Sequence, residues 1–155
     1  RSTRDDTQSY AGHASRWWMT KMSKVFHHSL RVIYGDTDMM GVVYYANYLR
    51  YFEAARTEVL REQDLSYVDF EKSGYAMPVA EANVRYHASA TYDDLLHVET
   101  RIDKIGGSSI VLSYRIIRDS DKVELCTGMT RHACVDQSGK VVKWPHWFKE
   151  KLNGS

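Results

Sequence analysis

The feature that most constrains the fold of this chain is a series of segments in its second half where apolar and polar side chains alternate. The alternation runs through residues 95–102, resumes over residues 110–116 after the Gly106-Gly107 turn, and continues over residues 123–135. A period of two is typical of half-buried β-strands, and tight turns between successive strands are typical of antiparallel pairing. The pattern therefore predicts an antiparallel sheet.

One amphipathic helix precedes these strands. Placed at about 100° per residue, its apolar side chains share an arc of roughly 140°, and all of its charged side chains but Arg56 lie outside that arc. We expect the helix to begin near Asn47 and to end near Asp64, after a short strand at residues 30–34 and a loop at residues 35–41. A single long helix followed by sequential strands predicts an α+β fold with the helix across one face of the sheet. The residues in the apolar arc are Tyr45, Tyr48, Leu49, Phe52, Ala55, Val59 and Leu60.

Composition excludes several classes of function. The chain has 155 residues, of which 43% are hydrophobic and 26% charged, as expected for one domain with its own core. Lys and Arg number 21 against 20 Asp and Glu, so the basic excess of a nucleic-acid-binding protein is missing. The chain has no apolar run near the roughly 18 residues that span a bilayer, and its start lacks the apolar segment of a signal peptide. We therefore expect no nucleic-acid partner, no membrane span and a cytoplasmic location.

The first 24 residues differ from the rest because they are polar and show neither period. We interpret them as an N-terminal extension ahead of a domain at residues 25–155. The extension is sequence introduced by cloning, an upstream segment or a docking arm. Trp17 and Trp18 are expected to pack on that domain or on a neighbouring subunit.

Two cysteines, Cys126 and Cys134, fall in one alternating stretch. They are not accompanied by a regular set of Cys and His ligands. We therefore expect two small buried strand residues, with no metal site and no cofactor.

Four segments, taken in order, resemble a known family. The stretch YGDTDMMGVVYYANYLRYFEAARTEVLRE at residues 34–62 closely resembles the hot-dog-fold acyl-CoA thioesterases of the 4-hydroxybenzoyl-CoA thioesterase type, including those associated with the Tol-Pal system. The resemblance continues in VRYHASATYDDLL from Val84, in GGSSIVLSYRI from Gly106, and in residues 128–135 with the closing DQSGK turn. It covers about residues 30–145.

The resemblance implies a hot-dog fold, in which a sheet of five or six antiparallel strands wraps around a long central helix. It also implies that two subunits pair and that the active sites lie at their interface. We therefore expect at least a homodimer, and the family favours a homotetramer.

The resemblance assigns the catalytic carboxylate to Asp38. Thioester hydrolysis needs a carboxylate that attacks the carbonyl carbon or activates water, and hydrogen-bond donors for the oxyanion. In the family this carboxylate precedes a glycine by three positions, as Asp38 precedes Gly41, and Asp36 then caps the turn. The helix that follows should offer unpaired N–H groups at its positive end as an oxyanion hole. The expected loop residues are Gly41, Val43 and Tyr44.

Residue 45 departs from part of the family. The Tol-Pal-associated branch has His here, whereas the 4-hydroxybenzoyl-CoA branch has Tyr in a segment similar to YYANY. We include Tyr45 as a catalytic residue, and three interpretations stay open from the sequence. It acts through its backbone N–H, it acts through its phenol, or its ring only lines the pocket.

Other side chains take their expected roles from the same resemblance. The acyl pocket is expected to be shaped by Tyr48, Tyr51, Phe52 and His87. The exposed CoA surface is expected at Lys104, Ser108, Ser109, Arg115 and Arg118.

Several charged residues are expected to be structural. Arg56 falls inside the apolar arc, where a charge needs a partner, so a structural ion pair, within the chain or across the dimer, is favoured over a substrate contact. Glu58 is expected on the solvated face of the helix. His97 and His132 are interpreted as ordinary strand residues, because the sequence places no Ser or Cys nucleophile beside them.

The function that these observations favour is hydrolysis of an acyl- or aroyl-CoA thioester to the free acid and CoA. One alternative is a non-catalytic hot-dog module that binds acyl groups or scaffolds an assembly. Another is a thioesterase that acts on acyl carrier protein. A dehydratase is less favoured, because the loop holds no His with an acidic partner. The sequence leaves the acyl chain open.

Overall fold

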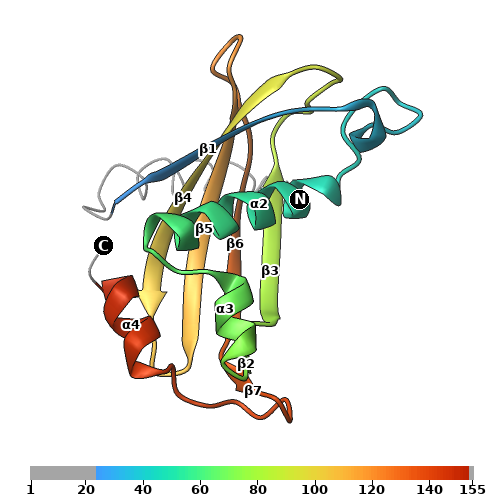
Figure 1. The fold of residues 1–155 in the computed structure, drawn as a ribbon. Coiled ribbons are helices and arrows are strands. Elements are labelled where there is room, and N and C mark those ends of the chain that lie inside the picture. The colour runs from blue at the N-terminus through green and yellow to red at the C-terminus, as the bar shows by residue number, and fades with distance from the viewer. Residues whose placement is uncertain (1–23, 154–155) are drawn as a thin grey trace, which may run out of the picture.

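The computed structural model describes residues 24–153 and contains a five-stranded antiparallel sheet with one long helix across it (Figure 1). The strands lie in the order β1-β4-β5-β6-β3. Helix α2 (Asn47–Glu62) crosses one face of this sheet, as the sequence predicted. Residues 1–23, including Trp17 and Trp18, lie outside the described residues, so the expected extension and its packing stay predictions. The strands are β1 (Phe26–Arg31), β3 (Val79–Tyr86), β4 (Leu95–Ile105), β5 (Ser109–Arg118) and β6 (Glu124–Ala133).

Short elements lie at the two ends of the sheet. At one end, the turn of 3-10 helix η1 (Tyr34–Asp36) begins the loop that leads to α2. At the other end lie helix α3 (Tyr67–Lys72) and the C-terminal helix α4 (His146–Asn153), which pack together through several aromatic rings (Figure 1). Strands β2 (Tyr75–Ala76) and β7 (Val135–Asp136) pair with each other nearby.

The first strand begins and ends earlier than the predicted residues 30–34. Strand β1 pairs with β4 from Phe26 opposite Thr100 to Arg31 opposite Leu95, and the pairing stops there. Beyond it, the Ile33 N–H donates to the Asp36 carboxylate at 3.2 Å, which closes the turn η1 instead of extending the strand.

The buried face of α2 differs from the predicted apolar arc at its start. Tyr45 precedes the helix and is 61% exposed, and Leu49 is 39% exposed. Tyr51, which the predicted arc did not include, is buried because its hydroxyl reaches Asp36 in the loop. At the centre, the Phe52 ring stacks on Tyr114 with centroids 4.3 Å apart. The buried residues of α2 are Tyr48, Tyr51, Phe52, Ala55, Val59 and Leu60.

The two cysteines are buried and unbridged, as predicted. Burial raises the pKa of the Cys126 thiol to about 12, so this side chain stays protonated and behaves as a small core residue. Within residues 24–153, no helix has both the length and the apolar character needed to cross a membrane.

Candidate active site

A cavity of about 310 Å³ lies where the loop before α2 meets the end of β3. It brings together five of the residues that the sequence assigned to the site, namely Asp38, Val43, Tyr45, Tyr48 and His87. The remaining lining residues are Met40, Val42, Tyr86, Ala88 and Ser89. A carboxylate, a phenol and an exposed imidazole therefore share one partly apolar cavity.

A tight turn holds Asp38 at this cavity. Its Oδ1 accepts the Met40 N–H at 2.9 Å, which is the side-chain bond of an Asx turn. Its carbonyl oxygen accepts the Gly41 N–H at 3.0 Å, and Gly41 has φ of 78°, in the left-handed region that glycine tolerates best. The second carboxylate oxygen, Oδ2, receives no hydrogen bond from residues 24–153. Asp38 is thus fixed in place with one oxygen open.

The expected oxyanion donors need correction, because three of the amides are already used inside the chain. Gly41 donates to Asp38, the Val43 N–H donates to the Ala90 carbonyl at 2.9 Å, and the Tyr44 N–H donates to the Asp36 carbonyl at 2.8 Å. The reason is that the loop does not pass directly into the helix. Residues 42 and 43 first form isolated bridges with other segments, and α2 begins only at Asn47.

The Tyr45 N–H is different. No acceptor for it is found in the described part of the chain, and residue 45 lines the cavity that holds Asp38. The Tyr86 hydroxyl donates to the Tyr45 carbonyl at 2.9 Å and so anchors this peptide from the end of β3. Of the backbone N–H groups at positions 41 and 43–45, only that of Tyr45 is left without an acceptor in the described residues and can donate to a ligand.

Asp36 is buried, and its Oδ1 lies 4.0 Å from Arg50 Nη1 without a hydrogen bond from residues 24–153. Its Oδ2 accepts the Tyr51 hydroxyl at 2.8 Å and the Ile33 N–H at 3.2 Å, while its carbonyl oxygen accepts the Asn47 amide at 2.8 Å. Burial and the bond to Asp36 raise the pKa of Tyr51, so this phenol remains a donor. Asp36 therefore ties the loop to the first turns of α2.

Two residues expected in the acyl pocket lie elsewhere. Tyr51 points to Asp36 and lines a separate groove between β1 and α2. Phe52 is fully buried between α2 and the sheet. Both fall on the buried face of the helix, one turn or more beyond the residues that border the Asp38 cavity, so neither reaches it.

The residues expected at the CoA surface are not gathered in one chain. Strand β5 carries Ser109 at one end and Arg118 at the other, about 30 Å apart, and Lys104 and Ser108 lie near Ser109. Arg115 is on the sheet face opposite α2, where it pairs with Glu99 at 2.7 Å.

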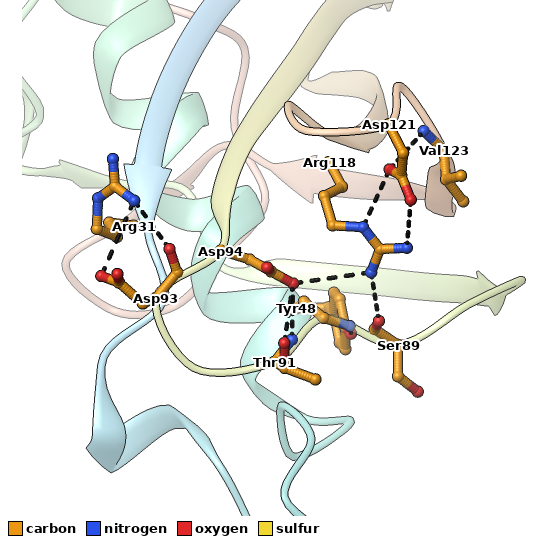
Figure 2. Close-up of polar contacts among 10 residues, drawn as sticks. Arg31, Tyr48, Ser89, Thr91, Asp93, Asp94, Arg118, Asp121 and Val123 are labelled. Atoms are coloured by element: carbon orange, nitrogen blue, oxygen red, sulfur yellow. Dashed lines mark hydrogen bonds and ion pairs between the residues drawn. The ribbon is translucent and has the colours of Figure 1, made fainter.

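Arg118 alone lies beside the cavity, but it is engaged in hydrogen bonds and ion pairs. It forms two bonds with the Asp121 carboxylate and donates to the Ser89 carbonyl at 2.9 Å (Figure 2). These contacts make Arg118 a support for the cavity wall.

Arg56 does not form the expected ion pair within the described residues. Its Nη1 donates to the Tyr114 hydroxyl at 3.3 Å, below the helix. Glu58 is on the outer side of α2 and pairs with Arg61, as a solvated residue would.

A hydrogen-bonded Ser, His and Asp set escaped the sequence analysis, which placed no nucleophile beside a histidine. His97 Nδ1 lies 2.8 Å from Ser29 Oγ, and His97 Nε2 lies 2.7 Å from Asp119 Oδ1. Ser29 belongs to β1, His97 to β4, and Asp119 directly follows β5. Only strand pairing brings the three together, and no pattern in the sequence predicts this contact. They lie on the sheet face opposite α2, away from the Asp38 cavity, and are read as a cross-strand clamp.

Comparisons with known proteins show the family to which the chain belongs. The sequence profile of the thioesterase-like superfamily matches residues 32–152. The acyl-CoA thioester hydrolase YbgC of Escherichia coli O6:H1 is 37% identical over 72% of this chain and 83% of its own length. A protein named putative acyl-CoA thioesterase YneP, from Bacillus subtilis (strain 168), is 33% identical over 78% of this chain and 88% of its own.

Solved structures give the same answer for the fold. The DHNA-CoA thioesterase of Staphylococcus aureus superposes with a TM-score of 0.78 at 29% identity, covering 84% of this chain and 91% of that one. The helix across a five-stranded antiparallel sheet is therefore the hot-dog fold that the sequence segments implied. The chain belongs to the thioesterase-like superfamily.

Proposed function

We propose that this chain hydrolyses an acyl- or aroyl-CoA thioester to the free acid and CoA. The observation that carries the proposal is the pairing of Asp38, with one free carboxylate oxygen, and Tyr45, with a free N–H, in one cavity. CoA is taken as the carrier because the relatives in Escherichia coli and Bacillus subtilis are named as acyl-CoA enzymes.

The proposed reaction begins at the thioester carbonyl. The free oxygen of Asp38 either attacks the carbonyl carbon or removes a proton from a water that attacks it. The carbonyl oxygen gains negative charge, and the Tyr45 N–H stabilises that charge. The C–S bond then breaks and CoA leaves as a thiolate, which takes a proton from Asp38 in the general-base route or from water in the nucleophilic route. Water supplies the second oxygen of the acid, directly or by hydrolysing an acyl-Asp38 intermediate.

We also propose that the working unit is at least a homodimer. Strand β3 is the last strand of the sheet, so one of its edges pairs with no other strand within residues 24–153. Most of its side chains are exposed, and Tyr86, at its end, lines the cavity. A second copy against this edge would close the cavity and cover the strand. Light scattering that gave the mass of one chain would contradict this assembly.

The test of the function is the change Asp38→Asn. The amide keeps the shape and the Asx turn but removes the nucleophile or base, so hydrolysis should fall at least about 100-fold. Release of free thiol from a panel of acyl-CoA and aroyl-CoA substrates measures the rate, and the melting temperature should change little.

Asp36→Asn is the matched control, because it makes the same chemical change two residues away. Since Asp36 is buried and accepts the Tyr51 hydroxyl, this change should lower the free energy of unfolding by about 1–3 kcal/mol and affect the rate less than Asp38→Asn does. The reverse ranking of the two rates would assign catalysis to the other aspartate. No hydrolysis of any substrate by the unchanged protein would refute the function itself.

A further inference from the structure

The hydroxyl of Tyr48 has an incomplete set of hydrogen bonds. Tyr48 is 2% exposed, and its oxygen accepts the N–H of Ala90 at 3.1 Å. That bond occupies the oxygen as an acceptor and leaves the phenol proton to be donated. No acceptor for this proton is found within residues 24–153. A buried donor without an acceptor is costly, so the geometry calls for a partner that residues 24–153 do not supply.

The neighbouring rings do not satisfy this proton. Tyr51 and Tyr86 meet the Tyr48 ring edge to face, with centroids 5.8 Å and 5.5 Å away. Their own hydroxyls are used elsewhere, at Asp36 and at the Tyr45 carbonyl. Burial raises the pKa of Tyr48, so the phenol keeps its proton at neutral pH. Tyr48 and Ser89, the residue before Ala90, both line the cavity that holds Asp38, so we take the acceptor of this proton to lie in the candidate active site.

The peptide that orients Tyr48 is itself held firmly (Figure 2). Arg118 donates to the Ser89 carbonyl at 2.9 Å, just before Ala90. On the other side, the Asp94 carboxylate accepts the Thr91 N–H at 2.9 Å and lies 3.7 Å from Arg118. The Ala90 carbonyl accepts the Val43 N–H, two residues before Tyr45. One residue, Ala90, therefore positions both the Tyr48 hydroxyl, through its N–H, and the loop that carries the Tyr45 amide, through its carbonyl.

We infer that the Tyr48 hydroxyl is the side-chain donor of the site and binds the thioester carbonyl oxygen together with the Tyr45 N–H. The inference rests on the proposed hydrolase function and adds a catalytic residue to it. A donor held in place before the reaction stabilises the oxyanion more than the ground-state carbonyl, so it acts mainly on kcat. Tyr48 is then more than a ring that shapes the acyl pocket.

The experiment compares Tyr48→Phe with Tyr67→Phe. The two tyrosines are matched, because the Tyr67 oxygen also accepts a backbone N–H, that of Met77 at 3.4 Å, but Tyr67 does not line the Asp38 cavity. Removing one oxyanion donor typically lowers kcat 10² to 10³-fold. For Tyr48→Phe we expect a kcat loss of at least about 30-fold with KM within about threefold. Tyr67→Phe should stay within about twofold of the unchanged protein, and both variants should lose a similar few degrees in melting temperature.

A second measurement does not need turnover. A methyl-ketone analogue, in which a CH₂ group joins the CoA sulfur to the carbonyl, offers the same carbonyl oxygen with no thioester bond to cleave. Calorimetry should show weaker binding of this analogue to Tyr48→Phe than to Tyr67→Phe, by about threefold or more.

The outcomes separate the two levels of the proposal. If the unchanged protein hydrolyses acyl-CoA and Tyr48→Phe keeps more than half of its kcat, only the role of Tyr48 is wrong. The same holds if kcat falls in proportion to a much larger loss of folded protein in Tyr48→Phe, or if the analogue binds both variants equally. If the unchanged protein neither hydrolyses acyl-CoA nor binds the analogue, the hydrolase function fails and the role of Tyr48 fails with it.

Discussion

Asp36 and Asp38 lie two residues apart in one loop, yet their carboxylates have different surroundings. Asp36 is 6% exposed and takes hydrogen bonds from a phenol and an amide, so its charge is used to hold the loop. In Asp38, Oδ1 accepts a hydrogen bond within its own turn, and Oδ2 accepts none from residues 24–153. From the sequence, Asp38 was assigned through the family resemblance, in which the catalytic carboxylate precedes a glycine by three positions. Which amide stays free beside it depends on contacts with Ala90 and Asp36, and these cannot be read from spacing.

At Tyr45, a catalytic role of the backbone N–H and a catalytic role of the phenol predict opposite results. The ring is 61% exposed, whereas the N–H is the free amide at the cavity. Tyr45→Phe keeps the amide and the ring, so kcat should fall by less than about fivefold. Tyr45→Pro removes the donor and should lower kcat by about 10² to 10³-fold. Steady-state rates and melting temperatures of both variants are the measurements.

The Pro variant can also lower the rate by shifting the loop. The Phe variant leaves the backbone unchanged, so it tests the phenol separately. A hundredfold loss in Tyr45→Phe at an unchanged melting temperature would show that the phenol takes part. In that case the amide is not the working group of residue 45.

At the scale of elements, periodicity predicted the long helix and the strands well. The helix begins at the predicted Asn47 and ends at Glu62, within two residues of the expected end. The errors fall where tertiary contacts override the local pattern. Tyr51 was missed on the buried face because its partner, Asp36, is fifteen residues away. The cavity was predicted only in part for the same reason, since β3 and the loop before α2 meet through long-range contacts.

The contact between α2 and the sheet depends on a small residue in β6. A Cβ atom at Gly128 would lie 2.5 Å from Phe52 Cε2 and 2.8 Å from the Asn83 carbonyl oxygen. Neither neighbour can move freely, because Phe52 is fully buried and Asn83 belongs to the paired strand β3. Gly128→Ala should therefore lower the free energy of unfolding by about 1–3 kcal/mol, measured by urea denaturation.

Gly107→Ala is the matched control for this change. A Cβ at Gly107 would meet no atom within 4 Å, so the free energy of unfolding should stay within about 0.5 kcal/mol. Both substitutions reduce the freedom of the unfolded chain equally, so their difference isolates the packing against Phe52. Equal free energies of unfolding for the two variants would mean that α2 does not pack against β6 as closely as the Phe52–Gly128 contact implies.

At the scale of the whole molecule, a chain of hydrogen bonds runs from α2 through the sheet. Arg56 donates to the Tyr114 oxygen, Tyr114 lies 2.7 Å from Thr130 Oγ1, and Thr130 lies 2.8 Å from His132 Nε2. His132 Nδ1 lies 3.3 Å from the Met77 carbonyl and so must carry a proton. His132 Nε2 then accepts from Thr130, which requires a neutral imidazole.

His132 should make the folded state sensitive to acid. Burial, with the nearby Arg56 charge, lowers the pKa of His132 to about 4, against about 6.5 in the unfolded chain. Between these values the unfolded state binds the extra proton, so stability falls as the pH drops from about 6.5 toward 4. The loss should reach about 2 to 3 kcal/mol near pH 4.5.

The measurement is the free energy of unfolding of the unchanged protein and of His132→Gln at a series of pH values from 7.5 to about 4.5. The variant lacks the titrating group, so its stability should fall less steeply over this range. His27→Gln, at an exposed position of β1, controls for the loss of one histidine. Parallel curves for the unchanged protein and His132→Gln would show that His132 is not buried in the neutral form.

The loop that carries Asp38 is held mainly by main-chain bonds, with Asp38 bonded to Val42, Val43 to Ala90 and Tyr44 to Asp36. A main-chain bond is indifferent to the side chain of the residue that makes it. The side chains of Met40 and Val42 border the cavity without holding the loop in place. A side-chain change at either position leaves those bonds intact, so if the proposed function holds, we expect the size of the accepted acyl group to respond to single substitutions at Met40 and Val42 while the loop keeps its conformation.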